Sequence, residues 1–201
     1  MCGRYAFDDI KDIFEARSII EDIASRLGED AAQSIKTGEV FPGDSAAVLA
    51  QVKGCCEAGI MSWGFPKAQS KQLIINARSE TVFNINIFRQ SVPERKCLIP
   101  CTGFYEWKSD GKRKIKHIIR PQGESFFYLA GLYGYFFTAG EKRNRFVILT
   151  AAANAQMQEI HHRMPLIVPK EYAERWLLSD MTPESVKRIY ELTSALDIET
   201  A

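Results

Sequence analysis

The second half of the chain contains four strand-like apolar segments in close succession, and this run most constrains the fold. The turn sequences Ser-Asp-Gly-Lys, Pro-Gln-Gly-Glu and Thr-Ala-Gly-Glu-Lys-Arg-Asn separate the segments. Such turn residues between apolar runs are typical of hairpins. We predict strands over residues 97–107, 114–120, 125–136 and 145–152. Three successive hairpins imply a curled antiparallel sheet.

Helical patterns lie on both sides of these strands. Apolar residues recur at helical spacing over 8–27, with Asp8 or Asp9 as the cap and Gly28 as the stop. Proline introduces two later segments, and Thr182 is a candidate cap for the second. We predict these helices over 170–178 and 183–196, short strands over 46–53 and 59–63, and a short strand followed by a helix within 76–89. The predicted fold is a single α+β domain spanning residues 1–201, with a barrel-like sheet flanked by helices.

Composition limits the possible partners. The chain has 26 Lys and Arg against 25 Asp and Glu, a net charge of +1. It therefore lacks the basic excess of a general nucleic-acid coat, and any such binding needs a local patch. Five cysteines without dense even spacing favour a reducing, cytoplasmic setting. We expect neither a signal peptide nor a membrane anchor, because no apolar run is long enough.

Cys2 is the most unusual residue for chemistry. It follows Met1, and a small second residue favours removal of the initiator methionine. Cys2 then carries a free α-amine with a pKa of about 7.7–8.0 beside a thiol with a pKa of about 8.5. Such a 1,2-aminothiol condenses with an aldehyde to an imine, and the thiol closes a thiazolidine ring. The alternative is a chance cysteine at an unstructured end.

Three further clusters carry chemical groups. The segment 76–81 places Asn76 and Arg78 close together, and Glu106 lies between two aromatic residues, where apolar surroundings can raise a carboxyl pKa. His161 and His162 are adjacent, so at most one is expected to face a given site. The alternatives are a solvated strand for Glu106 and core packing for at least one of Trp63, Tyr105 and Trp107.

A metal site is a weaker hypothesis. The pairs Cys55-Cys56 and His161-His162, together with Cys97 and Cys101, contain enough ligand atoms for zinc, but no Cys-x2-Cys pair is present. Buried structural thiols explain the four cysteines better. We expect no metal and no cofactor.

Taken together, these motifs resemble the SOS-response-associated peptidase family, whose members are also described as abasic-site processing proteins. The motifs are Met1-Cys-Gly-Arg4, Trp63-Gly64, Asn76-Ala-Arg-Ser-Glu-Thr81, Cys97-Leu-Ile-Pro100, Gly103-Phe-Tyr-Glu-Trp107 and Ile160-His-His-Arg-Met-Pro165. Their order and spacing match the family over essentially the whole chain. Cys101-Thr102 before Gly103 and the basic stretch 112–116 depart from the family pattern.

The resemblance implies a function and a set of site residues. Cys2 becomes the new N-terminus and crosslinks to a ring-opened abasic site in single-stranded DNA, in the DNA-damage response. The residues implied around it are Asn76, Glu106 and His161, and those along the DNA are Arg4, Trp63, Arg78 and Thr150. Autoproteolytic exposure of Cys2 and some lyase activity are also implied.

Each role has a chemical reason. Glu106 and His161 are suited to proton transfer, and Asn76 offers both a donor and an acceptor. Arg78 and Arg163 suit bidentate phosphate contacts, while Trp63 and Phe65 offer flat faces for unstacked bases. We expect a monomer in the cytoplasm, associated with the nucleoid when DNA is damaged.

Three other functions stay open. One is an N-terminal-nucleophile hydrolase, since glutamine amidotransferases also begin Met-Cys-Gly, although the rest of their signature is missing. A second is a general peptidase that uses Cys2, His161 and Glu106 as a relay. A third is a noncatalytic single-strand binder, for which Cys2 would be dispensable.

Overall fold

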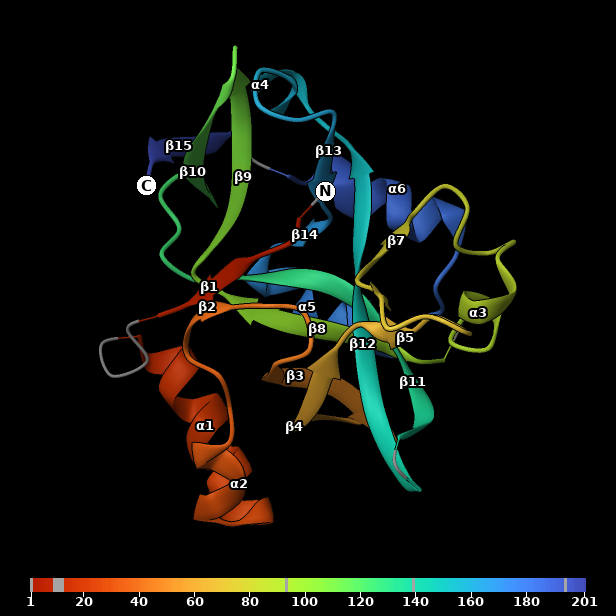
Figure 1. The fold of residues 1–201 in the computed structure, drawn as a ribbon. Helices are drawn as coiled ribbons and strands as arrows, with labels where there is room; N and C mark the ends of the chain where they lie inside the picture. Colours follow the sequence, from red (N-terminus) through yellow and green to blue (C-terminus); the bar gives the residue numbers. More distant parts are fainter. Residues whose placement is uncertain (1, 9–12, 93, 139, 194) are drawn as a thin grey trace.

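The centre of the molecule is a closed five-stranded barrel (Figure 1). The structure is a computed structural model, and it describes residues 2–8, 13–92, 94–138, 140–193 and 195–201. In barrel order the strands are β12 (Glu141–Ala152), β4 (Cys55–Trp63), β3 (Ser45–Val52), β8 (Lys96–Cys101) and β11 (Phe127–Thr138). Pairing of β11 with β12 closes the ring. The predicted barrel-like sheet with flanking helices is therefore confirmed.

One barrel contact differs from the antiparallel prediction. Strand β12 runs parallel to β4, with Phe146 opposite Trp63, whereas the other pairs in the ring are antiparallel. The hairpin pattern identifies only strands that are neighbours in sequence, whereas β4 ends at Trp63 and β12 begins at Glu141. The parallel pair is the point at which the N-terminal and C-terminal strands close the barrel.

Short strands extend the barrel sheet around β12 and β11. Strand β7 (Asn76–Arg78) pairs in parallel with β12, while β13 (Arg163–Pro165) pairs antiparallel with it. Strand β14 (Ile167–Val168) pairs antiparallel with β11. Strand β5 (Phe65–Pro66) pairs with β6 (Leu73–Ile74) in a separate two-stranded sheet. Strands β7 and β13 thus place two of the sequence motifs on either side of β12, which carries Thr150.

A second, five-stranded sheet lies beside the barrel. Its order is β15 (Leu196–Thr200), β10 (Arg113–Pro121), β9 (Gly103–Asp110), β1 (Tyr5–Phe7) and β2 (Gly38–Val40). The strand predicted over 97–107 is thus two strands in different sheets. At the break, the Thr102 backbone N–H donates to the Ala6 carbonyl oxygen at 2.8 Å, so the chain crosses from the barrel to β1.

The helices pack around the two sheets. They are α1 (Phe14–Leu27), α2 (Glu29–Gln33), α3 (Asn86–Arg89), α4 (Ala155–Gln158), a 3-10 turn (Lys170–Tyr172), α5 (Ala173–Leu178) and α6 (Pro183–Glu191). Among these helices of the described residues, none combines the length and apolar composition that crossing a bilayer requires.

Helix boundaries correct parts of the sequence prediction. Helix α1 ends at Gly28 as predicted, but it begins at Phe14, so Asp8 is not its cap and Asp9 lies outside the described residues. Helix α6 begins at the Thr182 cap, whose hydroxyl accepts the Ser185 N–H at 3.1 Å. It ends at Glu191 rather than at residue 196, because the chain then pairs with β10 as strand β15.

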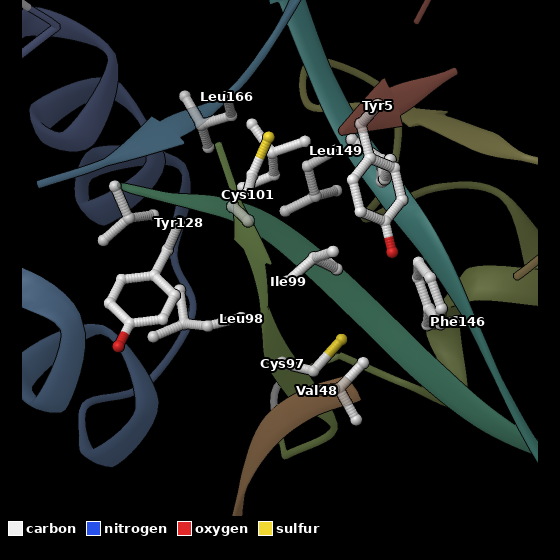
Figure 2. Packing of buried hydrophobic residues seen from close by; sticks show 14 of the residues in the cluster. Tyr5, Val48, Cys97, Leu98, Ile99, Cys101, Tyr128, Phe146, Leu149 and Leu166 are labelled. Atoms are coloured by element: carbon white, nitrogen blue, oxygen red, sulfur yellow. The ribbon is translucent and has the colours of Figure 1, made fainter. Parts of the chain in front are cut away.

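Alternating side chains of β8 serve two parts of the core. Figure 2 shows Leu98 on the side of Tyr128, while Ile99 lies on the side of Leu149. The thiols of Cys97 and Cys101 are fully buried, as predicted. Cys55 and Cys56 are exposed, which corrects the prediction of four packed thiols. They begin β4 directly after the tight turn at Lys53 and Gly54, where a hairpin end protrudes from the core.

Candidate functional site

Cys2 lies three residues before the start of β1 and has no exposed surface. Its thiol donates a weak hydrogen bond to the Arg4 carbonyl oxygen, with an S···O distance of 3.7 Å. Burial raises the pKa of the Cys2 thiol well above its usual range, and the nearby charge of Glu106 raises it further. Cys2 is therefore a neutral thiol in an enclosed position, unlike the exposed thiolate of a typical cysteine nucleophile.

Asn76 holds the backbone of Cys2. Its Nδ2 donates to the Cys2 carbonyl oxygen at 3.0 Å, across 74 residues of sequence. The pairing of β7 with β12, with Asn76 opposite Ile148, fixes this position. The Asn76 Oδ1 atom is buried and accepts no hydrogen bond from the described residues. One end of the amide is thus committed to Cys2, and the other remains an acceptor.

Glu106 is buried in the middle of β9, with only 4% of its surface exposed. Phe104, two residues earlier in β9, pairs with Tyr5 of β1. This pairing brings β9 alongside the segment that begins at Cys2. The effect of its charge on the Cys2 thiol also shows that the two side chains are close. The alternative of a solvated carboxylate on an exposed strand face is wrong, because both faces of this strand segment are covered.

His161 lies in the short connection between α4 and β13. Its Nδ1 lies 3.0 Å from the Arg163 backbone nitrogen and 3.2 Å from the Arg163 carbonyl oxygen. A neutral ring accepts the N–H at Nδ1 and carries its proton on Nε2, whereas a protonated ring donates from Nδ1 to the carbonyl. The backbone therefore offers a partner to both protonation states, which suits a group that takes up and releases a proton.

His162 stacks on His161 instead of pointing away from it. The two ring centroids are 4.3 Å apart with an interplanar angle of 27°. His162 is exposed, and the positive charge of His161 lowers the pKa of the His162 ring. Of the two rings, His161 is the half-buried one.

Arg163 connects the strands around this site. Its guanidinium binds Glu80 through two hydrogen bonds of 2.5 and 3.0 Å, and it donates to the Thr150 carbonyl oxygen at 2.6 Å. Arg163 is only 8% exposed and Thr150 is fully buried. In this structure both side chains are committed to contacts that link β13, β12 and the segment after β7, and their contact with DNA stays a prediction.

Arg4 and Arg78 lie closer to solvent. Arg4 is half-buried, pairs with Glu39 at 2.8 Å, and lies over the rings of Phe41 and Trp107 at 4.3 and 5.0 Å. Arg78 is exposed, and its side chain forms no hydrogen bond or ion pair with the described residues. Of the predicted DNA-binding residues, Arg78 is the one whose charge is fully available to a ligand.

A family model described as SOS response associated peptidase (SRAP) matches residues 1–200. The chain belongs to this family. It is 33% identical to "Abasic site processing protein YoaM" of Bacillus subtilis over 194 residues, which cover 88% of this chain and 79% of that protein. It is 30% identical to "Abasic site processing protein YoqW" of the same organism, over 99% of this chain and 90% of that protein.

A solved structure shares the architecture of this SRAP chain. A crystal structure of a protein from Bacteroides thetaiotaomicron superposes with a TM-score of 0.74, covering 99% of this chain and 91% of that one at 24% sequence identity. At that identity the similarity concerns the fold alone. It shows that the barrel and second sheet described above also occur together in a solved structure.

The two predicted stacking residues of this SRAP chain are in its core. Trp63 and Phe65 have no exposed surface, and Trp63 stacks on Phe146 with ring centroids 6.2 Å apart. Trp63 Nε1 donates to the Ile75 carbonyl oxygen at 2.9 Å. The core-packing alternative therefore holds for Trp63, and Phe65 is buried as well, so neither ring presents a free face in this structure. For Trp63, this packing supports the residues that lead into Asn76.

Sequence reasoning missed two acidic residues that hold the predicted arginines. Glu80 binds Arg163, and Glu39 binds both Arg4 and Lys116. Glu80 lies within the motif that contains Asn76, so its position was a usable signal. Nothing in the sequence around Glu39 connects it with Arg4. The described residues contain no group of three or more His, Cys, Asp or Glu side chains placed to hold a metal ion.

Proposed function

We propose that this protein processes abasic sites by forming a covalent crosslink between Cys2 and a ring-opened abasic site in single-stranded DNA. The observation that carries the proposal is the enclosed position of Cys2, whose backbone is held by Asn76 and whose thiol lies near Glu106. The names of the similar Bacillus proteins support abasic-site processing. The partner is thus a DNA strand that carries an aldehyde, and no cofactor is required.

The reaction follows from the two nucleophiles of Cys2. After Met1 is removed, the α-amine attacks the aldehyde carbon of the open sugar and forms a carbinolamine. Loss of one water gives an imine. The sulfur then adds to the imine carbon, and the thiol proton passes to the nitrogen, which closes a five-membered thiazolidine. The net change is one C–N bond and one C–S bond formed and one water released.

The enclosed position of the thiol favours ring closure. A neutral, buried thiol reacts poorly with distant electrophiles. Here the imine carbon would be bonded to the α-nitrogen of the same residue, so attack by the sulfur closes a five-membered ring. Proximity therefore replaces thiolate activation. The same burial keeps water away from the imine, which would otherwise hydrolyse.

Asn76, Glu106 and His161 have distinct parts in this proposal. Asn76 holds the Cys2 carbonyl through Nδ2 and offers its buried Oδ1 to the reacting amine or to a sugar hydroxyl. Glu106 transfers protons between the amine and the departing water. His161, with a backbone partner for either protonation state, protonates or deprotonates the sugar oxygen during ring opening.

DNA binding rests mainly on Arg78, whose charge is exposed and uncommitted. Arg4 adds a second charge at the edge of β1, while Arg163 and Thr150 fix the strands that carry these groups. The imine intermediate also permits strand cleavage by elimination, so limited lyase activity accompanies crosslinking. The family name supports peptidase-type self-processing that exposes Cys2.

The deciding experiment incubates the protein with a single-stranded oligonucleotide that carries one abasic site. We expect a heat-stable adduct on a denaturing gel with the native chain and none with Cys2→Ala. Cys2→Ser keeps an amine and a hydroxyl, and it should give only an adduct that needs borohydride reduction to survive. An equal heat-stable adduct with Cys2→Ala would contradict the proposal.

The same variants separate the alternative functions. A cysteine hydrolase without DNA specificity predicts cleavage of an unrelated peptide or of glutamine that is lost in Cys2→Ala. A noncatalytic binder predicts that Cys2→Ala binds DNA like the native chain and that neither forms an adduct. Peptide hydrolysis and adduct formation are therefore measured on the same preparations.

A further inference from the structure

A pocket lies between the segment that follows β7, the end of β12 and helix α6. It has a volume of about 300 Å³. We call it the α6 pocket. Its lining includes Ser79, Glu80, Phe83, Ala152, Val186 and Tyr190.

One short stretch of chain links the α6 pocket to the proposed crosslinking site. Asn76 binds the Cys2 carbonyl, Arg78 is exposed, and Ser79 lines the pocket. Three residues of extended chain span at most about 11 Å. A stacked DNA strand advances by about 3.4 Å per nucleotide, so this distance corresponds to the first few nucleotides beside the abasic one.

The walls of the pocket suit a flat aromatic ligand. Phe83 and Tyr190 contribute half-buried rings, and Ala152 and Val186 add apolar surface. The volume is at the low end of the range for small-molecule pockets, so it suits one ring system better than a larger group. Ser79 supplies a hydroxyl for the edge of that ring.

The charges around the pocket are compatible with a DNA strand. Glu80 is the acidic residue of the wall, but it is paired with Arg163, and this hydrogen bonding holds the pKa of the Glu80 carboxyl below its usual range. Arg78 lies on the adjoining chain, and Lys187 lines the pocket with a 77% exposed side chain that forms an exposed ion pair with Glu191 at 3.7 Å. A base can therefore enter while its phosphates remain beside cations.

From this arrangement we infer that the α6 pocket binds the base of one nucleotide that flanks the abasic site on the same strand. The inference rests on the proposed function. Stacking of a base on aromatic side chains gives about 1–3 kcal/mol, which corresponds to roughly a fivefold to hundredfold gain in binding. The pocket would make crosslinking sensitive to the presence of a particular neighbouring base.

The test uses a set of oligonucleotides with one reactive abasic site and, at one neighbouring position, a tetrahydrofuran residue that lacks a base and cannot form an imine. The tetrahydrofuran is moved through the three positions on each side. At subsaturating protein, we expect removal of one particular base to slow crosslinking about tenfold, and the other removals to have smaller effects.

Variants of the pocket connect this dependence to the structure. Ala152 is exposed, so Ala152→Phe fills the pocket without entering the core. With the oligonucleotide that has all its flanking bases, this variant should crosslink as slowly as the native chain does when the bound base is missing. Removal of that base should then have no further effect on the variant. Tyr190→Ala should also lose the dependence, whereas Tyr190→Phe keeps the ring and should retain it. Thermal unfolding of each variant verifies that it is folded.

The outcomes distinguish this inference from the proposed function. If the native chain forms no adduct with any substrate, the proposed function fails. If it forms adducts at equal rates with every flanking pattern, the function stands and the α6 pocket inference is overturned. The inference is also overturned if folded Ala152→Phe and Tyr190→Ala both keep the native dependence, because the sensitive base then binds elsewhere.

Discussion

At the scale of single residues, the candidate site depends on where Cys2 is held rather than on an activated thiol. Burial and Glu106 both disfavour the thiolate, so the chemistry that fits Cys2 is one in which the amine reacts first. Asn76 is the long-range contact that holds the Cys2 carbonyl. The sequence pointed to both residues by type and position, but it contained no information on the hydrogen bond between them.

The first prediction concerns the residue before Cys2. A chain that retains Met1 has its Cys2 nitrogen in a peptide bond, which cannot form an imine. We expect such a sample to bind single-stranded DNA yet to crosslink only in the fraction that lacks Met1. Intact mass spectrometry of the protein and of the adduct measures both fractions, and treatment with a methionine aminopeptidase should raise the yield. An adduct whose mass includes Met1 would refute this.

At the scale of secondary-structure elements, three neighbouring strands assemble the motifs. Strand β12 carries Thr150 between β7 on one side and β13 on the other. The Arg163 guanidinium then ties β13 to β12 and to Glu80 after β7. The sequence predicted Arg163 as a phosphate ligand because it shows the residue type but not whether the side chain is buried. The burial of Arg163 depends on the register of β13 against β12.

The Glu80–Arg163 pair predicts a pH dependence of stability. Because hydrogen bonding lowers the pKa of Glu80 in the folded state, its contribution is fully present above the unfolded-state pKa of about 4.3 and is lost as the pH falls through the lower folded-state value. Since the Glu80 side chain is 50% exposed, we expect Glu80→Gln to cost only about 1 kcal/mol near neutral pH.

Urea unfolding at several pH values measures this effect. The difference between the native chain and Glu80→Gln should be constant near neutral pH and should shrink below about pH 4. Lys187→Gln is a matched control, because it changes an exposed charge at the same pocket without a group that titrates there; we expect it to stay within about 0.5 kcal/mol of the native chain. A difference that grows on acidification would contradict the assignment.

At the scale of the whole molecule, barrel closure depends on close approach at Gly131 of β11. A Cβ atom there would lie 2.6 Å from Ile99 Cδ1 and 2.8 Å from the Val147 carbonyl oxygen. Gly131 therefore has a packing function in β11. Ile99 of β8 and the backbone of β12 approach Gly131 so closely that they leave no room for a side chain at this position.

We therefore expect Gly131→Ala to lower the free energy of unfolding by about 2 kcal/mol, the scale of an overpacked core. Gly59→Ala is the control, since a Cβ at Gly59 of β4 would have nothing within 4 Å, and it should be neutral or slightly stabilising. Chemical denaturation of both variants gives the comparison. Equal stability of the two variants would mean that the atoms around Gly131 move aside for the added methyl group at no measurable cost, which would contradict the prediction.

The sequence alone determined the strand-rich second half, the helix ends at Gly28 and Thr182, and the identity of the reactive groups, because these depend on local periodicity, caps and residue chemistry. Tertiary structure alone decided that β4 and β12 close the barrel in parallel, that residues 97–107 divide between two sheets, and that Trp63, Phe65 and Arg163 are buried. Each of these depends on contacts between distant segments. Local pattern specifies which residues can pair or be buried, and only packing of the whole chain selects the partner.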